Sequence, residues 1–236
     1  MKYAIISDIH EDIVSLQKVI THINRTDSDK LVCLGDITGF SALHHAHKDT
    51  KDANACIDLL NACCDIIVVG NHDLNIIGKI PSYLNRHEKA NSNIPWDTWS
   101  YKGEANAIIS SENLDFLKQL PEYLIETADN FQILFSHFIY PDVTGSTIMI
   151  PENKRALKPH FNFMQRKGCL LSFVGHTHIN GFALSRGRHV HFKEFGFERL
   201  SKKQQIIFGP GIVRNGIRSG YMIFDTDTFE LSIIKI

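Results

Sequence analysis

Short apolar runs alternate along this chain with segments in which apolar residues recur at helical spacing. Five runs rich in β-branched and apolar residues, each bounded by Gly or polar residues, predict buried strands. They cover residues 3–6, 31–34, 66–69, 131–135 and 170–174. Amphipathic helices are predicted at 11–25 and 52–64, between the first three strands. The resulting β-α-β-α-β order favours parallel strands joined by right-handed crossovers.

The rest of the chain follows a less regular pattern. Residues 75–130 contain a further helical segment near 113–119, which Pro121 ends. After Gly175, four more strands are predicted at 190–193, 205–208, 221–225 and 230–235. Because no repeat, low-complexity tract or linker divides the chain, the simplest packing is one domain over 1–236, with two sheets and flanking helices.

Composition narrows the classes of partner. With 236 residues, 43% of them apolar and 22% charged, the chain has the make-up of an ordinary globular protein. Its net charge of -1 gives no electrostatic attraction to long nucleic acid or to membranes. No signal peptide or membrane-spanning stretch is expected. The five cysteines lie in apolar runs, as free thiols of a reducing compartment do, so we expect a cytoplasmic protein. The oligomeric state is left open.

Each of the five predicted strands ends in residues that commonly bind metal ions. The ends read Ser7-Asp8-Ile9-His10, Gly35-Asp36, Gly70-Asn71-His72-Asp73, Ser136-His137 and Gly175-His176-Thr177-His178. A single Asp or His after a strand is usually a turn residue or a helix cap. Ligands of open α/β sheets bind at the carboxyl ends of the strands, so five such ends together predict one metal site.

The candidate ligands are all oxygen or nitrogen donors. They are Asp8, His10, Asp36, Asn71, His137, His176 and His178. Without a thiolate, the set suits Mn, Fe, Co, Ni or Zn. These ligands are too many for one open site, but they suffice for two divalent ions that share a bridging carboxylate. Such a pair of ions can generate hydroxide at neutral pH and stabilise an in-line phosphoryl displacement.

In this order and spacing, the motifs resemble the full motif set of calcineurin-like metallophosphoesterases. The resemblance spans residues 8–178, and the C-terminal part is similar to that of small prokaryotic phosphodiesterases in the superfamily. It implies a four-layer αββα sandwich of two mixed sheets flanked by helices. It also implies ligand roles: Asp8, His10 and His178 for the first metal, Asn71, His137 and His176 for the second, and Asp36 as the bridge.

The same resemblance implies how the reaction would proceed. A metal-bridging hydroxide would attack the phosphorus in line with the leaving group. His72 would contact the phosphate and protonate the leaving oxygen. Asp73 would orient the His72 ring.

The chain departs from the family pattern in four places. Glu11-Asp12 follows the first histidine where Gly-Asn is common, and we interpret these acidic residues as helix caps. The segment 37–40 lacks the arginine of Ser/Thr protein phosphatases, and Asp73 stands where those enzymes usually have Glu. Both differences favour small phosphoesters over phosphoproteins. The turn at 209–212 has lost the polar side chains of the Asn-Pro-Gly-Ser motif.

Three segments keep two interpretations each. Arg214 or Arg218 can clamp phosphate, although solvated loop arginines are the simpler interpretation. The cluster His44-His45-Ala46-His47 can cover the metals, although an exposed loop is more usual. The aromatic patch from Trp96 to Tyr101 can stack a nucleobase or pack against the core.

The sequence therefore predicts a phosphoesterase that uses two divalent metal ions, and most directly a phosphodiesterase acting on a small substrate. One alternative is a pyrophosphohydrolase of the diadenosine tetraphosphatase kind, using the same metals. The other is a non-catalytic, protein-binding scaffold on the same fold. The presence of every ligand position and of His72 argues against the scaffold.

Overall fold

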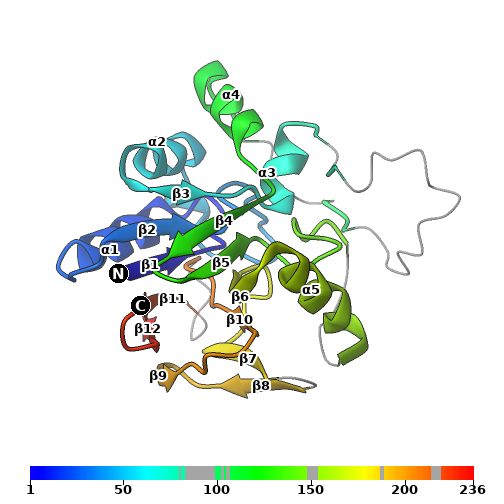
Figure 1. Ribbon diagram of the computed structural model, residues 1–236. Coiled ribbons are helices and arrows are strands. Elements are labelled where there is room, and N and C mark those ends of the chain that lie inside the picture. The colour runs from blue at the N-terminus through cyan, green and yellow to red at the C-terminus, as the bar shows by residue number, and fades with distance from the viewer. Residues whose placement is uncertain are drawn as a thin grey trace, which may run out of the picture.

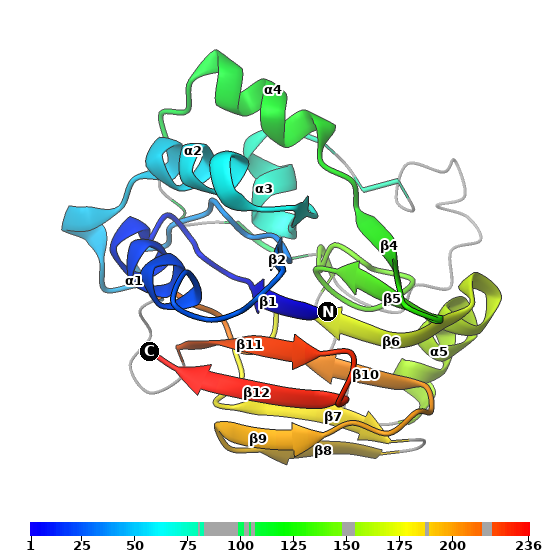
Figure 2. The same cartoon turned by 60° about the vertical axis from the view of Figure 1, so that its left-hand side comes forward.

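Two β-sheets pack face to face in the computed structural model, and helices cover their outer faces (Figures 1 and 2). The structure describes residues 1–79, 81–82, 99–101, 104, 107–147, 154–186, 189–213 and 219–236. Within these residues the strand orders are β3-β2-β1-β11-β12-β9 and β4-β5-β6-β10-β7-β8. Each sheet mixes parallel and antiparallel pairs, so the predicted sandwich of two mixed sheets with flanking helices is confirmed.

The first sheet contains the predicted β-α-β-α-β unit. Its parallel strands are β1 (Lys2–Ile6), β2 (Lys30–Cys33) and β3 (Ile66–Ile67), connected through α1 (Ile13–Ile23) and α2 (Ala53–Cys63). The antiparallel strands β11 (Gly220–Asp225), β12 (Glu230–Lys235) and β9 (Gly196–Arg199) complete it. The Asp12 carboxylate accepts a hydrogen bond from the Ser15 N–H at 3.0 Å, which confirms Asp12 as the cap of α1.

The second sheet is built around three parallel strands. These are β5 (Phe131–Ser136), β6 (Cys169–Val174) and β10 (Gln205–Phe208), and α5 (Lys154–Lys167) connects the first two. The antiparallel strands are β4 (Tyr123–Ala128), β7 (Phe182–Arg186) and β8 (His189–Lys193). The sequence analysis did not predict α5, β4, β7 or β9. Shorter elements are η1 (Lys48–Thr50), α3 (Asn71–Ile76) and α4 (Ser111–Gln119).

Strands of both sheets are buried on both faces, which explains their continuous apolar runs. Along β1, Tyr3 and Ile5 belong to the core between the sheets, whereas Ala4 and Ile6 belong to the core beneath α1 and α2. The Tyr3 and Phe135 rings meet across the sheets with their centroids 5.8 Å apart. Burial on both sides fixes the strand positions, and therefore the directions in which the chain leaves the strand ends.

The carboxyl ends of the parallel strands meet at one edge of the sandwich. The Asp8 N–H donates to the Gly35 carbonyl at 3.0 Å, which joins the ends of β1 and β2. The Gly175 N–H donates to the His137 carbonyl at 2.9 Å, which joins the ends of β6 and β5. These bonds bring the predicted ligand segments from both sheets together.

Two further predictions concern the cysteines and the membrane. All five cysteines are free; Cys33, Cys56 and Cys169 are buried, while Cys63 and Cys64 are half-buried. Among the described residues, the helices are too short or too polar to cross a bilayer.

Candidate metal centre

Six of the seven predicted ligands form two clusters at the shared strand edge. Asp8, His10 and His178 make one cluster, and Asp36, His137 and His176 make the other. Within each cluster the potential ligand atoms lie within 4.8 Å of one another. Segments more than a hundred residues apart in sequence thus present their donor atoms to common points.

In the first cluster, two imidazoles and a carboxylate converge. His10 Nε2 lies 3.1 Å from His178 Nε2, which in turn lies 3.2 Å from Asp8 Oδ1. His10 Nδ1 lies 3.1 Å from the Gly39 carbonyl oxygen, to which it donates its hydrogen. This bond leaves the Nε2 lone pair of His10 facing the cluster, which is how a metal-ligating histidine is usually oriented.

The second cluster repeats this arrangement. His137 Nε2 lies 3.2 Å from His176 Nδ1 and 3.0 Å from Asp36 Oδ2. His137 donates its Nδ1 hydrogen to the Leu34 carbonyl at 2.7 Å, so its Nε2 also faces the cluster. Asp36 Oδ2 is 3.9 Å from His10 Nε2 in the first cluster. The Asp36 carboxylate therefore lies between the two clusters.

The charges in the two clusters suit a cation. Burial would raise the pKa of Asp36, but the His137 and His72 imidazoles hold it well below its ordinary value. Burial lowers the pKa of His176 to about 4, helped by His137, so this ring is neutral at physiological pH. Burial would also lower the pKa of His137, yet the Asp36 charge raises it to about 9. A proton on His137 thus balances the carboxylates where a metal ion would do so.

The backbone is strained at the predicted ligands. Asp8, His10, Asp36, His176 and His178 have φ between 44° and 65°, a left-handed conformation that costs about 1–3 kcal/mol where it is unfavourable. Apart from Glu11, which adjoins His10, the described residues outside Gly show this conformation only at Asp129 and Phe229. Such strain persists where the surrounding structure enforces it, and it is typical of functional sites.

The glycines before the ligands permit close chain contact. A Cβ atom on Gly70 would lie 2.1 Å from Asp36 Oδ1, and one on Gly175 would lie 1.8 Å from Ser7 Oγ. Both distances are far shorter than van der Waals contact. The Gly-Asn and Gly-His motifs therefore keep the ligand-bearing turns in contact with each other.

Asn71 is the seventh predicted ligand and begins α3. Its side chain is fully buried, and neither Oδ1 nor Nδ2 makes a hydrogen bond of normal geometry, although the Tyr101 hydroxyl interacts with the amide. A buried amide with unused polar atoms is costly unless another group binds it. A cation beside Asn71 would satisfy Oδ1, so the residues present fit a second metal ion here.

The structure places His72 at the site but separates it from Asp73. The Asp73 carboxylate accepts hydrogen bonds from the Thr38 and Gly70 N–H groups at 2.9 and 3.1 Å. His72 Nδ1 instead lies 2.7 Å from Glu104 Oε1. Glu104 therefore takes the position beside His72 that the sequence analysis assigned to Asp73.

His72 also belongs to a cluster of possible ligands. It joins His10 and Asp36, and its Nε2 lies 3.9 Å from Asp36 Oδ2. Burial would lower the pKa of His72, but the charges of Asp36 and Glu104 raise it above its ordinary value. An imidazole held in this way can donate a proton.

The two aromatic residues of the patch that the structure describes, Trp99 and Tyr101, lie at the site. The Tyr101 and Trp99 rings have their centroids 5.4 and 6.1 Å from that of His72, and Trp99 is also 6.1 Å from His176. Trp96, Arg214 and Arg218 lie outside the described residues. In the sequence, only the aromatic residue types of the patch suggested that it lies beside the metal centre. No motif or pattern in the sequence suggested a role for Glu104.

The histidine cluster after β2 is not simply an exposed loop. His44 is exposed, but His45 is half-buried, with its ring centroid 4.6 Å from that of His10. His47 is buried, and its Nε2 lies 2.8 Å from the His10 carbonyl oxygen. The expectation of an exposed loop is therefore wrong for His45 and His47.

Two other departures from the family pattern have structural roles. Glu11 does not cap α1; its buried carboxylate accepts the N–H groups of Gly39 and Phe40 at 3.2 and 3.0 Å. A Cβ atom on Gly211 would lie 2.9 Å from Asp8 Cβ and 3.1 Å from His178 Nδ1. The turn at 209–212 thus lies directly against the first cluster.

Comparison with known proteins agrees with this geometry. The chain belongs to the calcineurin-like phosphoesterase family, whose model matches residues 1–180. It is a metallophosphoesterase, that is, a hydrolase of phosphoesters that uses divalent metal ions, and the two clusters are where such ions can bind.

Three similar proteins illustrate the extent of the match. An uncharacterised protein of Methanocaldococcus jannaschii is 29% identical over 99% of this chain and 86% of its own length. A metallophosphoesterase structure from Sphaerobacter thermophilus superposes with a TM-score of 0.72 at 24% identity, covering 100% of this chain and 88% of that chain. A hypothetical protein of Pyrococcus horikoshii covers 100% of this chain and 87% of its own, with a TM-score of 0.61 and 12% identity. The structural matches establish the shared fold.

Proposed function

We propose that this protein is a dinuclear phosphodiesterase that hydrolyses a small phosphodiester in the cytoplasm. The observation that supports it most strongly is the position of Asp36, whose Oδ2 lies 3.0 Å from His137 Nε2 and 3.9 Å from His10 Nε2. A carboxylate between two donor clusters suits a bridge between two cations. The free thiols suit a reducing compartment.

The two clusters and the family resemblance together support the following ligand assignment. Asp8, His10 and His178 would hold one cation, Asn71, His137 and His176 the other, and Asp36 both. Bound divalent ions such as Mn, Fe, Co, Ni or Zn supply hydroxide at neutral pH for in-line attack and neutralise charge on the phosphoryl oxygens. The Leu34 and Gly39 carbonyls accept the Nδ1 hydrogens of His137 and His10, so each Nε2 would be the ligating nitrogen once a cation replaces the proton on His137.

His72 would protonate the leaving oxygen. Its Nε2 faces Asp36 at 3.9 Å, so the ring edge points to the position where the phosphoryl group would lie. Glu104 Oε1, 2.7 Å from Nδ1, would fix the ring orientation and favour the protonated form. In this proposal Glu104, rather than Asp73, is the positioning residue.

A second candidate activity is pyrophosphohydrolysis of a dinucleotide polyphosphate. Trp99 favours it, because its ring lies 6.1 Å from those of both His72 and His176 and can stack a nucleobase bound beside the metals. The same ligands would serve a phosphoanhydride. A protein-binding scaffold is the remaining alternative, and it predicts no turnover with either substrate.

The test compares two esters after metal reconstitution. The protein is stripped, reloaded with manganese and assayed with bis-p-nitrophenyl phosphate and p-nitrophenyl phosphate, while bound metal is counted by mass spectrometry. Two metal ions per chain and faster turnover of the diester are expected. Preference for the monoester would contradict the phosphodiesterase assignment. No hydrolysis of either ester by protein that holds two metal ions would favour the polyphosphate or scaffold alternative.

A variant of His72 tests its role separately. His72→Asn should lower turnover of alkyl phosphodiesters, whose leaving oxygen needs a proton, by about 10²–10⁴-fold, the usual contribution of general acid catalysis, while both metals stay bound. Loss of a metal ion would instead identify His72 as a ligand, as its cluster with His10 and Asp36 allows.

A further inference from the structure

His45 lies beside the metal centre without belonging to either ligand cluster. Its ring packs against that of His10 at 4.6 Å between centroids, with an angle of 39° between the ring planes. On its other sides it contacts Phe40 at 5.8 Å and His47 at 5.5 Å. The residue as a whole is half-buried.

One hydrogen bond determines which His45 nitrogen carries the hydrogen. The Ser41 N–H donates to His45 Nδ1 at 3.2 Å, so Nδ1 must offer a lone pair. In a neutral imidazole the hydrogen is then on Nε2. A metal ligand needs a lone pair at the coordinating nitrogen, and Nε2 has none in this tautomer. His45 is therefore a donor and not a further metal ligand.

The hydrogen bond that the His45 ring makes to the residues that the structure describes is at Nδ1, and it leaves the Nε2–H donor unused. The segment that carries it is nevertheless held firmly. Ser41 pairs with Glu104 in an isolated antiparallel bridge, and His47 Nε2 lies 2.8 Å from the His10 carbonyl oxygen. A fixed donor with an open hydrogen, next to His10, has the properties of a substrate-binding group.

We propose that His45 binds substrate by donating its Nε2–H to an oxygen of the phosphoryl group. This inference rests on the proposed function, because it takes the metal centre as the place where the phosphoryl group binds. A neutral donor is well suited to this position, since it stabilises an anionic oxygen without adding another positive charge beside the cations. Hydrogen bonds to charged groups are worth about 1.5–3 kcal/mol, which corresponds to roughly 10–150-fold in affinity.

The test measures orthophosphate binding to the manganese-loaded protein by calorimetry, so that it does not depend on turnover. His45→Phe keeps a ring against His10 but removes the donor, and it should weaken orthophosphate binding at least about tenfold with unchanged metal content. His45→Gln keeps an N–H donor and an oxygen that can accept from Ser41, and it should stay within about threefold of the unmodified protein. His44→Phe, at the exposed neighbour, is the matched control and should bind as the unmodified protein does.

Two results would overturn the inference. Unchanged orthophosphate affinity in His45→Phe would show that the donor does not reach the anion. Loss of metal from both His45 variants would show that the residue supports the ligands instead. If orthophosphate binding depends on His45 while no phosphodiester is hydrolysed, the inference stands and the proposed function fails. If diesters are hydrolysed and orthophosphate binds His45→Phe normally, the inference alone fails.

Discussion

The ligand side chains at the strand ends and the side chains that cover them are held by different kinds of structure. Asp8 and His176 each follow a strand that is buried between two cores. The Asp8 N–H donates to the Gly35 carbonyl, and the His176 N–H donates to the Asp8 carboxylate. Glu104 and His45 belong to irregular segments, which a single bridge between Ser41 and Glu104 joins. The strand ends are therefore positioned by the regular structure of two sheets, whereas the covering segments are positioned by a few individual long-range contacts.

Trp99, in another covering segment, is also held by a few individual contacts. The backbone N–H of Trp99 donates to the Ser146 carbonyl at 2.8 Å. The Asp142 carboxylate in turn accepts the backbone N–H of Ser146 at 3.0 Å. Trp99 thus depends on one loop, which in turn depends on one buried carboxylate. Changes in the covering segments should reduce activity in part, whereas changes at the strand ends should abolish metal binding.

The largest effect is expected at the carboxylate between the clusters. Asp36→Asn keeps the shape of the side chain and an oxygen that accepts the backbone N–H of His72. It removes the negative charge that two cations would share. Because losing a mere outer-shell partner costs about 10–100-fold in metal affinity or activity, losing this ligand should cost more than about 100-fold, with both metals depleted. The bound metal ions are counted by mass spectrometry, and the loss of activity is measured as diester turnover.

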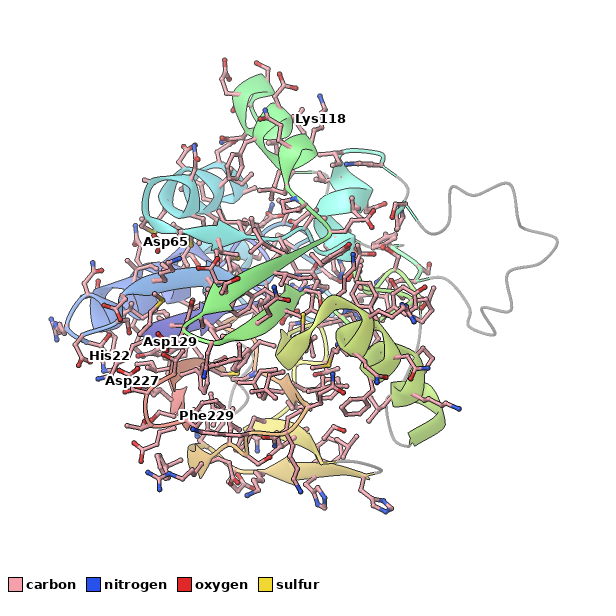
Figure 3. All side chains as sticks on the ribbon, in the orientation of Figure 1. His22, Asp65, Lys118, Asp129, Asp227 and Phe229 are labelled. Atoms are coloured by element: carbon pink, nitrogen blue, oxygen red, sulfur yellow. The ribbon has the colours of Figure 1, made fainter. Side chains whose placement is uncertain are left out.

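A matched control uses a carboxylate far from the site. Asp227 pairs with the N-terminal amino group at 3.4 Å, near the start of β1 (Figure 3). Asp227→Asn should leave metal content and turnover unchanged. If Asp36→Asn lost a single metal and kept the other, the assignment of a shared ligand would be wrong.

A smaller effect is expected at Glu104, in the covering segment. Glu104→Gln keeps a hydrogen-bond acceptor but removes the charge that stabilises His72 in its protonated form. Turnover of alkyl phosphodiesters, whose leaving oxygen needs a proton, should fall about 10–100-fold. Turnover of p-nitrophenyl diesters, which release a stable anion, should change much less, and metal content should not change.

The comparison of alkyl with p-nitrophenyl diesters also shows whether Glu104 or Asp73 positions His72. Glu112, exposed on α4, supplies the control Glu112→Gln, which should behave as the unmodified protein does. If Asp73→Asn rather than Glu104→Gln produced the selective loss with alkyl diesters, the role implied by the sequence would be restored to Asp73.

An effect on stability is expected at His160, which secures the loop after β5. His160 is fully buried; its Nδ1 accepts the Tyr140 N–H at 2.8 Å and its Nε2 lies 2.9 Å from Ser172 Oγ. His160→Gln should lower the free energy of unfolding of the metal-free protein by about 1–3 kcal/mol at pH 7.5. Urea unfolding measures it.

The pH dependence of this difference has a definite sign. Burial lowers the pKa of His160 to about 3 from its ordinary 6.5, so between these values the unfolded chain binds a proton that the folded chain excludes. Stability from this group is fully present above pH 6.5 and is lost as the pH falls towards 3, by about 1.4 kcal/mol per pH unit. The gap between the unmodified protein and His160→Gln should therefore narrow in acid. A constant gap would contradict a buried neutral ring.

The smallest effect is expected at Trp99. Trp99→Ala removes a ring that can stack an aromatic group, which should raise KM for aromatic phosphodiesters about 2–10-fold and leave kcat nearly unchanged. Dialkyl phosphodiesters should show no such change, and Ser100→Ala, at the exposed neighbour, is the control. A fall in kcat with loss of metal would mean that Trp99 supports His176 instead.

Regular elements could be predicted where local pattern and packing agree. The runs at 3–6 and 131–135 became β1 and β5, because continuous apolar sequence suits strands buried on both faces. The helix α5 escaped prediction because it is polar and contains Pro159. It forms because Leu157 and Met164 pack on the outer face of the second sheet. Tertiary packing there outweighs local propensity.

The sequence by itself determined the strand ends and the donor residues placed on them, since the strand period and the common edge of parallel strands are local and repetitive rules. Only the tertiary structure decided that Glu104, and not Asp73, faces His72, and that His45 packs on His10. Glu104 and His45 belong to irregular segments, which the isolated bridge between Ser41 and Glu104 joins. A single long-range contact leaves no period in the sequence, because its position depends on how the whole chain packs.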